Sequence, residues 1–312
     1  MNTPSNAVSE SAVQSQAAAP AVMTPGRVFY WCVRRELWEY RSVYLAPLAI
    51  AAMILLGYVF VLVPLPHTMQ HAMTLDLAHQ REELAQPFTI AAALIMGAAF
   101  IVSIFYSIDA LYGERRDRSI LFWKSLPVSD LTTVLAKASI PLLVMPVVTF
   151  AITVATESIM LLLSSMVLLG SGQSVAAFWN RLELYRALFM LLYHLVTAHM
   201  LWYAPLYAWL LLISAWARRA PFLWAVLPPF AIGVFEKIAF HTSYFAAFLQ
   251  DRIGGGVSAV NNEEHSGAMP MDPGIHLTPG AFVASPGLWL GLVFAAIFLV
   301  AAARLRRHRQ PI

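Results

Sequence analysis

Apolar residues follow one another in long runs along this chain, and short segments that carry most of the charges separate the runs. A helix needs about 20 predominantly apolar residues to cross the hydrocarbon core of a bilayer. The runs therefore predict six membrane-spanning helices. They cover residues 45–65, 88–108, 140–165, 188–214, 221–241 and 286–303. Three charged side chains fall inside these spans: Glu157, Glu236 and Lys237.

Composition supports the same fold class. The chain has 312 residues, of which 59% are hydrophobic and 12% are charged, and its mean hydropathy is +0.66. Soluble domains carry about 25% charged residues, so this chain has too few charges to cover a water-facing surface. We expect an all-α integral membrane protein in contact with membrane lipid, with its transmembrane domain over residues 45–304.

The placement of the basic residues predicts an orientation. If the N-terminus lies inside, the inner segments hold fifteen Lys and Arg residues and the outer segments hold four. Segments close to the spans keep their basic residues on the cytoplasmic side. Both termini are therefore predicted to be cytoplasmic, with outer segments at residues 66–87, 170–186 and 242–285.

The two ends of the chain differ from the spans. Residues 1–26 have no Lys or Arg and lack the basic start and apolar core of a signal peptide, which predicts a disordered cytoplasmic tail. Residues 27–44 mix Arg and Glu with aromatic residues at three- or four-residue intervals, which favours an amphipathic helix in the inner interface. The alternative is that they form the hydrated end of the first span. Residues 305–312 form a basic cytoplasmic tail.

Several chemistries have no motif in this sequence. A phosphate-binding loop needs a Gly-Lys pair, and the chain contains none. It also lacks the H-E-x-x-H pattern of helix-borne zinc sites and the G-x-S-x-G pattern of a nucleophile elbow. Cys32 is the single cysteine, which excludes a disulfide framework. We expect no catalysis by the chain itself, no cofactor or metal bound by it and no nucleic-acid partner.

One predicted inner loop, residues 112–137, has an ordered pattern. A charged run from Glu114 to Arg118 precedes the apolar run from Ile120 to Trp123, and Leu126 and Pro127 follow. Ser129 and Asp130 are then placed to cap the next helix, because side-chain oxygens and negative charge both stabilise a helix N-terminus. The pattern predicts a short helix that ends near Pro127, followed by a helix that enters the third span.

This loop resembles that of the membrane subunits of ATP-binding-cassette exporters of the type-2 permease family. Those subunits have a Glu, then Thr or Ser before Leu or Ile, a further Leu, and a closing Leu-Pro-Val-Ser or close variant. Ser119 stands here where Thr is more usual, and the run before it is more basic. The matching positions are Glu114, Ser119, Ile120, Leu121, Leu126, Pro127, Val128 and Ser129.

The resemblance implies a subunit of an exporter in a bacterial inner membrane. Two permease subunits, here two copies of this chain, would pair with two copies of a separate ATPase subunit, which would bind ATP and Mg. The loop would contain the coupling helix, with apolar anchors and arginines at the rim of the contact. The residues expected there are Glu114, Arg115, Arg116, Arg118, Leu121, Phe122, Trp123, Leu126 and Pro127. The alternative is that Phe122 and Trp123 only lie in the membrane interface and the arginines only set the topology.

Charges inside a span are costly, so each suggests a partner or a water-filled cavity. Glu157 is expected to face a cavity or to pair with His194 or His199. Glu236 and Lys237 either line a substrate pathway or stay near the outer headgroups, with Lys237 extended towards water. All three are candidates for the substrate pathway, but no residue identifies the substrate.

Other readings stay open. His67, Met69, His71, Met73 and His79 include ligand types that suit copper, but an amphipathic outer helix accounts for them more simply. Residues 242–285 form either short re-entrant helices or a hydrophilic loop. A transporter or channel driven by an ion gradient, or a scaffold or sensor subunit without transport, is the alternative to an ATP-driven exporter. A neighbouring gene that encodes a phosphate-binding loop would favour the exporter.

Overall fold

The computed structural model describes residues 24–125, 128–254 and 279–308, and every regular element in these ranges is helical. Within them, six helical stretches are long and apolar enough to cross a membrane. The expected all-α architecture with six candidate membrane-spanning helices is thus confirmed. The stretches are Ser42–Leu62, His79–Arg116, Asp130–Gly170, Val175–Trp202, Pro221–Phe240 and Pro286–His308.

Each predicted span falls on helix. The first lies on α2 (Ser42–Leu62) and the second on α4 (Leu77–Asp109). The third lies on η2 (Ile140–Val144) and α8 (Met145–Gly170), which continue from α7 (Asp130–Ser139). The fourth extends over α10 (Leu184–His194), η3 (Leu195–Trp202) and α11 (Ala204–Trp216), and the last two lie on α12 (Pro221–Phe240) and α15 (Pro286–His308).

Each predicted outer segment contains helix, which the sequence suggested for 66–87 and, as one of two alternatives, for 242–285. Segment 66–87 is occupied by most of α3 (Leu65–Ala72) and by the first residues of α4, and segment 170–186 contains α9 (Val175–Leu182). Segment 242–285 contains α13 (Tyr244–Ile253) and α14 (Pro279–Ala284), while residues 255–278 lie outside the described part.

The two ends of the chain are described in part. The predicted interfacial helix at 27–44 corresponds to α1 (Pro25–Glu39), and α2 begins within the predicted range, at Ser42. The structure does not describe residues 1–23 or 309–312, so most of the predicted N-terminal tail and half of the basic tail lie outside it.

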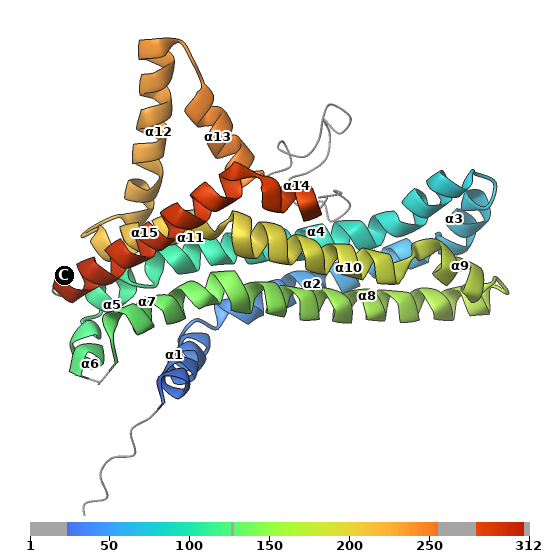
Figure 1. Cartoon of the computed structure of the whole chain (residues 1–312). Helices are drawn as coiled ribbons and strands as arrows, with labels where there is room; N and C mark the ends of the chain where they lie inside the picture. Colours follow the sequence, from blue (N-terminus) through green and yellow to red (C-terminus); the bar gives the residue numbers. More distant parts are fainter. Residues whose placement is uncertain (1–23, 126–127, 255–278, 309–312) are drawn as a thin grey trace, which may run out of the picture.

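The helices α2, α4, α8 and α10 lie side by side, with α11 and α15 packed together beside α4 (Figure 1). One end of this bundle carries α1, α5 (Tyr112–Arg116), α6 (Ile120–Ser125), α7 and the C-terminal end of α15, and we call it the loop end. The opposite end carries α3 and α9, and we call it the far end. The helix α12 extends away from the bundle, and α13 runs back to it (Figure 1).

Apolar packing holds the bundle together at both ends. At the far end, Tyr58, Phe88 and Met160 belong to one buried cluster, and the hydroxyls of Tyr58 and Ser164 are 2.7 Å apart. At the loop end, Val134 and Leu211 belong to another.

Two segments, η2 and η3, have π-helical geometry and pack against each other. Pro141 lies in η2 and Pro146 follows it closely, and neither can donate a backbone hydrogen bond. The wider π turn is a common adjustment at such positions and occurs frequently near functional sites.

Candidate functional site

A buried network of ion pairs lies at the loop end. Its first centre is Glu36 on α1, whose two carboxylate oxygens accept hydrogen bonds from Lys137 Nζ on α7 at 2.9 and 3.0 Å. The hydroxyl of Tyr106 on α4 donates to the same carboxylate at 2.9 Å, and Arg35 also pairs with it. Glu36 and Lys137 are almost completely buried, so this ion pair is shielded from water.

Glu114 on α5 is the second centre. Its carboxylate accepts hydrogen bonds from Arg35 at 3.0 Å and Arg306 at 3.1 Å, and Lys137 Nζ lies 3.2 Å away. Arg306, near the end of α15, also pairs with Asp130 at the start of α7. The two centres therefore tie α1, α4, α5, α7 and α15 together, and the charges of the buried acids are matched by nearby bases.

The Arg115 side chain is buried inside the protein and does not lie on the surface where the sequence placed it. Its Nη2 donates to the backbone oxygens of Ser214 at 2.8 Å and Ala217 at 2.5 Å, where α11 ends. Terminal carbonyls of a helix lack partners within the helix, and a guanidinium is suited to supply them. The Ser214 hydroxyl accepts from the backbone N–H groups of Leu111 and Tyr112, so α5 is fixed to α11 from both sides.

The two other predicted arginines are exposed. Arg116 donates to Asp117 at 3.0 Å and lies 3.7 Å from Asp109. Arg118 stands at the turn into α6 with a φ of 59°, a left-handed conformation that is uncommon outside glycine. Of the four charged residues predicted for this contact, the structure therefore leaves Arg116 and Arg118 at the surface and buries Glu114 and Arg115.

The short helix α6 presents apolar side chains outward. Ile120 is buried beneath it, whereas Leu121 and Phe122 are each 60% exposed. Trp123 is half-buried because the Arg35 guanidinium lies over its ring, 3.6 Å from the centroid. The predicted residues Leu126 and Pro127 lie outside the described part of the chain.

The contacts of α6 and α7 complete this end of the protein. Lys124 Nζ donates to the backbone oxygen of Arg307 at 3.3 Å, which joins α6 to the end of α15. The predicted helix cap is confirmed at Ser129, whose hydroxyl accepts from Thr132 N at 3.0 Å. Asp130 occupies the first turn of α7.

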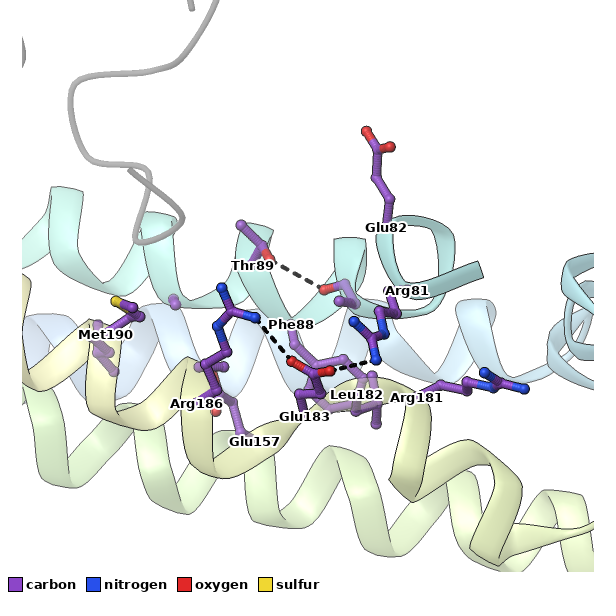
Figure 2. Close-up of a pocket in the computed structure, with 14 residues that line it drawn as sticks. Arg81, Glu82, Phe88, Thr89, Glu157, Arg181, Leu182, Glu183, Arg186 and Met190 are labelled. Carbon is purple, nitrogen blue, oxygen red and sulfur yellow. Dashed lines mark hydrogen bonds and ion pairs between the residues drawn. The ribbon is translucent and has the colours of Figure 1, made fainter. Parts of the chain in front are cut away.

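A cavity of about 560 Å³ lies towards the far end, between α4, α8, α9 and α10. Glu157 lines it, together with apolar residues that include Phe88 and Leu191 (Figure 2). Glu183, at its rim, pairs with Arg81 at 2.6 Å and with Arg186 at 3.3 Å. This confirms that Glu157 faces a cavity, one of the two expectations for it.

Glu236 and Lys237 are not among the residues that line this cavity. The Glu236 carboxylate accepts from the backbone N–H groups of Tyr244 and Phe245 at 2.8 Å each, and from the Thr242 hydroxyl at 2.9 Å. It therefore holds the turn between α12 and α13. Lys237 is exposed on α12. The three charges of the predicted spans are thus not brought together in one place.

The His, Cys, Asp and Glu side chains of the described residues do not gather into a metal site. Among them, no group of three His, Cys, Asp or Glu side chains is arranged to hold a metal ion. His71 lies 3.5 Å from Glu83, His79 lies 2.5 Å from Asp76, and Met69 is buried in the far-end cluster.

The chain was compared with known protein families, with curated proteins and with solved structures. None of the three comparisons found a match.

Proposed function

We propose that this chain is the permease subunit of an ATP-binding-cassette exporter in a bacterial inner membrane, with both termini cytoplasmic. Two copies would assemble with two copies of a separate ATPase subunit, which would bind ATP and Mg. The observation that carries the proposal is α6, a short helix at the loop end that exposes two large apolar side chains and is held by a buried ion-pair network.

The surface of α6 has the composition of a docking site. Leu121 and Phe122 are exposed next to the exposed charges of Arg116 and Arg118. Apolar anchors at the centre of a contact supply most of its binding free energy, and charges at the rim steer the approach of a partner. The basic residues of the predicted cytoplasmic side gather at this same end, where a cytoplasmic ATPase would meet it.

The buried network suits the transmission of movement from α6. Trp123 of α6 packs under Arg35, which pairs with both centres of the network. Glu114 then connects to α7 through Lys137 and to α15 through Arg306. A push on α6 would therefore move α1, α7 and α15 together, because these elements share buried charges that are costly to separate.

The experiment is to purify the protein from its native membranes and ask whether an ATPase subunit with a phosphate-binding loop accompanies it. Leu121→Ser/Phe122→Ser should reduce the recovered ATPase and its substrate-stimulated ATP hydrolysis by at least about ten-fold, equivalent to about 1.4 kcal/mol of binding. Both side chains are exposed, so the variant should fold normally.

Leu131→Ser is the matched control, because Leu131 is also an exposed leucine at the loop end but lies on α7. It should leave the recovered ATPase unchanged. If the α6 variant retains full association and full stimulation, or if no ATPase accompanies the wild-type protein, the proposal is wrong.

A further inference from the structure

Three buried side chains on one face of α8 each have a polar atom without a hydrogen-bond partner. Thr149, Thr153 and Glu157 are spaced by four residues, so they lie above one another on the same side of the helix. All three are buried, and Thr149 Oγ1, Thr153 Oγ1 and Glu157 Oε2 have no partner among the described residues. Buried polar atoms are normally paired, so an unpaired row of them indicates a place for water or a ligand.

A segment in contact with α8 also carries a buried polar atom without a partner. The π segment η3 contacts α8, and it carries His199, whose Nε2 is also buried without a partner. A carboxylate, two hydroxyls and an imidazole thus lie on α8 and η3, two contacting segments of candidate membrane-spanning helices. Intramembrane polar groups of this kind commonly mark the route of a substrate or an ion.

The row ends in the cavity that Glu157 lines. Glu157 is only 5% exposed, and around it the cavity is walled by apolar side chains such as Phe88, Leu182 and Leu191. Its volume of about 560 Å³ falls within the usual range for small-molecule sites. The cavity therefore combines apolar walls with one buried acid, which suits a ligand that is mostly apolar.

The charged residues of the cavity differ in whether they are paired within the protein. Arg81 and Arg186 both pair with Glu183, so that carboxylate already engages both guanidinium groups (Figure 2). Glu82 and Arg181 also line the cavity, but their charged ends point away from this pair in Figure 2. Glu157, in contrast, has no ion pair among the described residues of the cavity. Two guanidinium groups share one carboxylate, so the rim keeps a positive charge, whereas the buried charge without an ion pair is the Glu157 carboxylate, deep in the site.

We propose that this cavity binds an organic cation, with its positive group against the Glu157 carboxylate and its apolar body against Phe88, Leu182 and Leu191. Binding requires only this chain. The further statement that the cation is the exported substrate rests on the proposed function. The two can fail separately, because binding is measured here on the permease without any ATPase.

The test compares two probes of matched shape and opposite charge, tetraphenylphosphonium and tetraphenylborate, by equilibrium binding to the purified protein in lipid nanodiscs. The wild-type protein should bind the phosphonium and bind the borate at least about ten-fold more weakly. Glu157→Gln removes the charge and preserves the shape, so it should weaken phosphonium binding at least about ten-fold. Glu157→Asp, which keeps the charge, should retain most of it.

Glu83→Gln is the matched control, because it removes a carboxylate from the same helix, α4, at a position that does not line the cavity. It should leave phosphonium binding within about two-fold of the wild type. Equal phosphonium binding by wild type and Glu157→Gln, or a preference for the borate, would overturn the proposal.

A second measurement uses the wild-type protein alone and does not depend on a variant that folds. Dicyclohexylcarbodiimide modifies carboxyl groups in apolar surroundings, and mass spectrometry locates the modified residue. Tetraphenylphosphonium should slow the modification of Glu157. Modification of Glu157 at the same rate with and without the phosphonium would show that the cation does not occupy the site.

Discussion

Lys137 is the cation that the two centres of the loop-end network share. It donates to Glu36 and lies 3.2 Å from Glu114, and its side chain is 1% exposed. Removing one member of a buried ion pair leaves the other charge without compensation and typically costs about 3–5 kcal/mol. Lys137→Met should therefore lower the thermal unfolding temperature markedly, as measured on the purified protein in detergent.

Two comparisons separate this effect from a general effect of losing a positive charge. Arg116→Met removes an arginine whose ion pairs are exposed, and it should change the unfolding temperature little. Glu36→Gln combined with Lys137→Met should recover part of the loss, because the uncompensated carboxylate is then absent. If the double variant is no more stable than Lys137→Met, Glu36 is not the partner that matters.

Cys32 provides a test of the packing of α1. It is half-buried, and burial raises the pKa of its thiol although nearby Arg35 acts in the opposite direction. The thiolate is the reactive form of cysteine. Iodoacetamide should therefore alkylate Cys32 several-fold more slowly in the folded protein than in protein unfolded with a denaturing detergent at the same pH. Equal rates, followed by mass spectrometry, would mean that α1 does not pack as described.

The residues of the loop-end network could be predicted only in part. Glu114 was singled out because the order of residues around it resembles a family pattern. Its partners Arg35 and Arg306 are 79 and 192 residues away in sequence, and Glu36 is 101 residues from Lys137. Nothing in a single sequence pairs charges across such distances, because the pairing depends on how the helices are placed. For the same reason, Arg115 was expected at a surface and proves to be buried.

At the scale of whole helices, the sequence located the spans but not their ends. The spans were recognised by the absence of charge, whereas a helix continues wherever its backbone hydrogen bonds do. The helix α4 therefore begins at Leu77 and includes Arg81, Glu82 and Glu83 before the apolar run starts. Likewise, α7 begins at Asp130 and carries Lys137 into the buried network.

The contact between α13 and α15 depends on Gly291, which has no side chain that would collide with Arg252. Arg252 on α13 donates to the backbone oxygens of Trp202 at 3.1 Å and Gly287 at 2.8 Å, and its guanidinium lies over the Trp202 ring. A Cβ atom at Gly291 would lie 2.5 Å from Arg252 Nη2. Gly291→Ala should therefore displace Arg252 and destabilise this contact by about 1–3 kcal/mol.

Limited trypsin digestion measures that displacement, because trypsin cleaves after arginine and Arg252 is buried. Cleavage after Arg252 should be faster in Gly291→Ala than in the wild type. Gly287→Ala is the matched control on the same helix, since its Cβ would meet Trp202 at an ordinary 3.5 Å. Equal cleavage rates in the wild type and both variants would show that Arg252 is not held by this close approach.

At the scale of the whole molecule, the helices are unequally covered. Of the six candidate spans, α12 is the least buried inside the chain, and it extends away from the bundle (Figure 1). Its exposed apolar side chains suit contact with lipid as well as with a second permease subunit. Lipid, or the second copy in the proposed homodimer, would therefore contact the chain along α12.

The orientation of the molecule decides whether α6 can meet a cytoplasmic ATPase. The inner segments of the predicted topology carry most of the Lys and Arg residues, and such segments stay on the cytoplasmic side of a membrane. In a Cys32→Ser background, we expect Ser125→Cys at the loop end to be cytoplasmic and Ser171→Cys at the far end to face outward. Both serines are exposed, so neither change should disturb the fold.

A membrane-impermeant maleimide applied to intact cells should then label Ser171→Cys at once and Ser125→Cys only after the membrane is permeabilised. The Cys32→Ser protein without a new cysteine is the control and should stay unlabelled in both conditions. The reverse pattern would place α6 outside the cell. Since ATP is supplied in the cytoplasm, that result would rule out both the predicted topology and the proposed role of α6 as the ATPase contact.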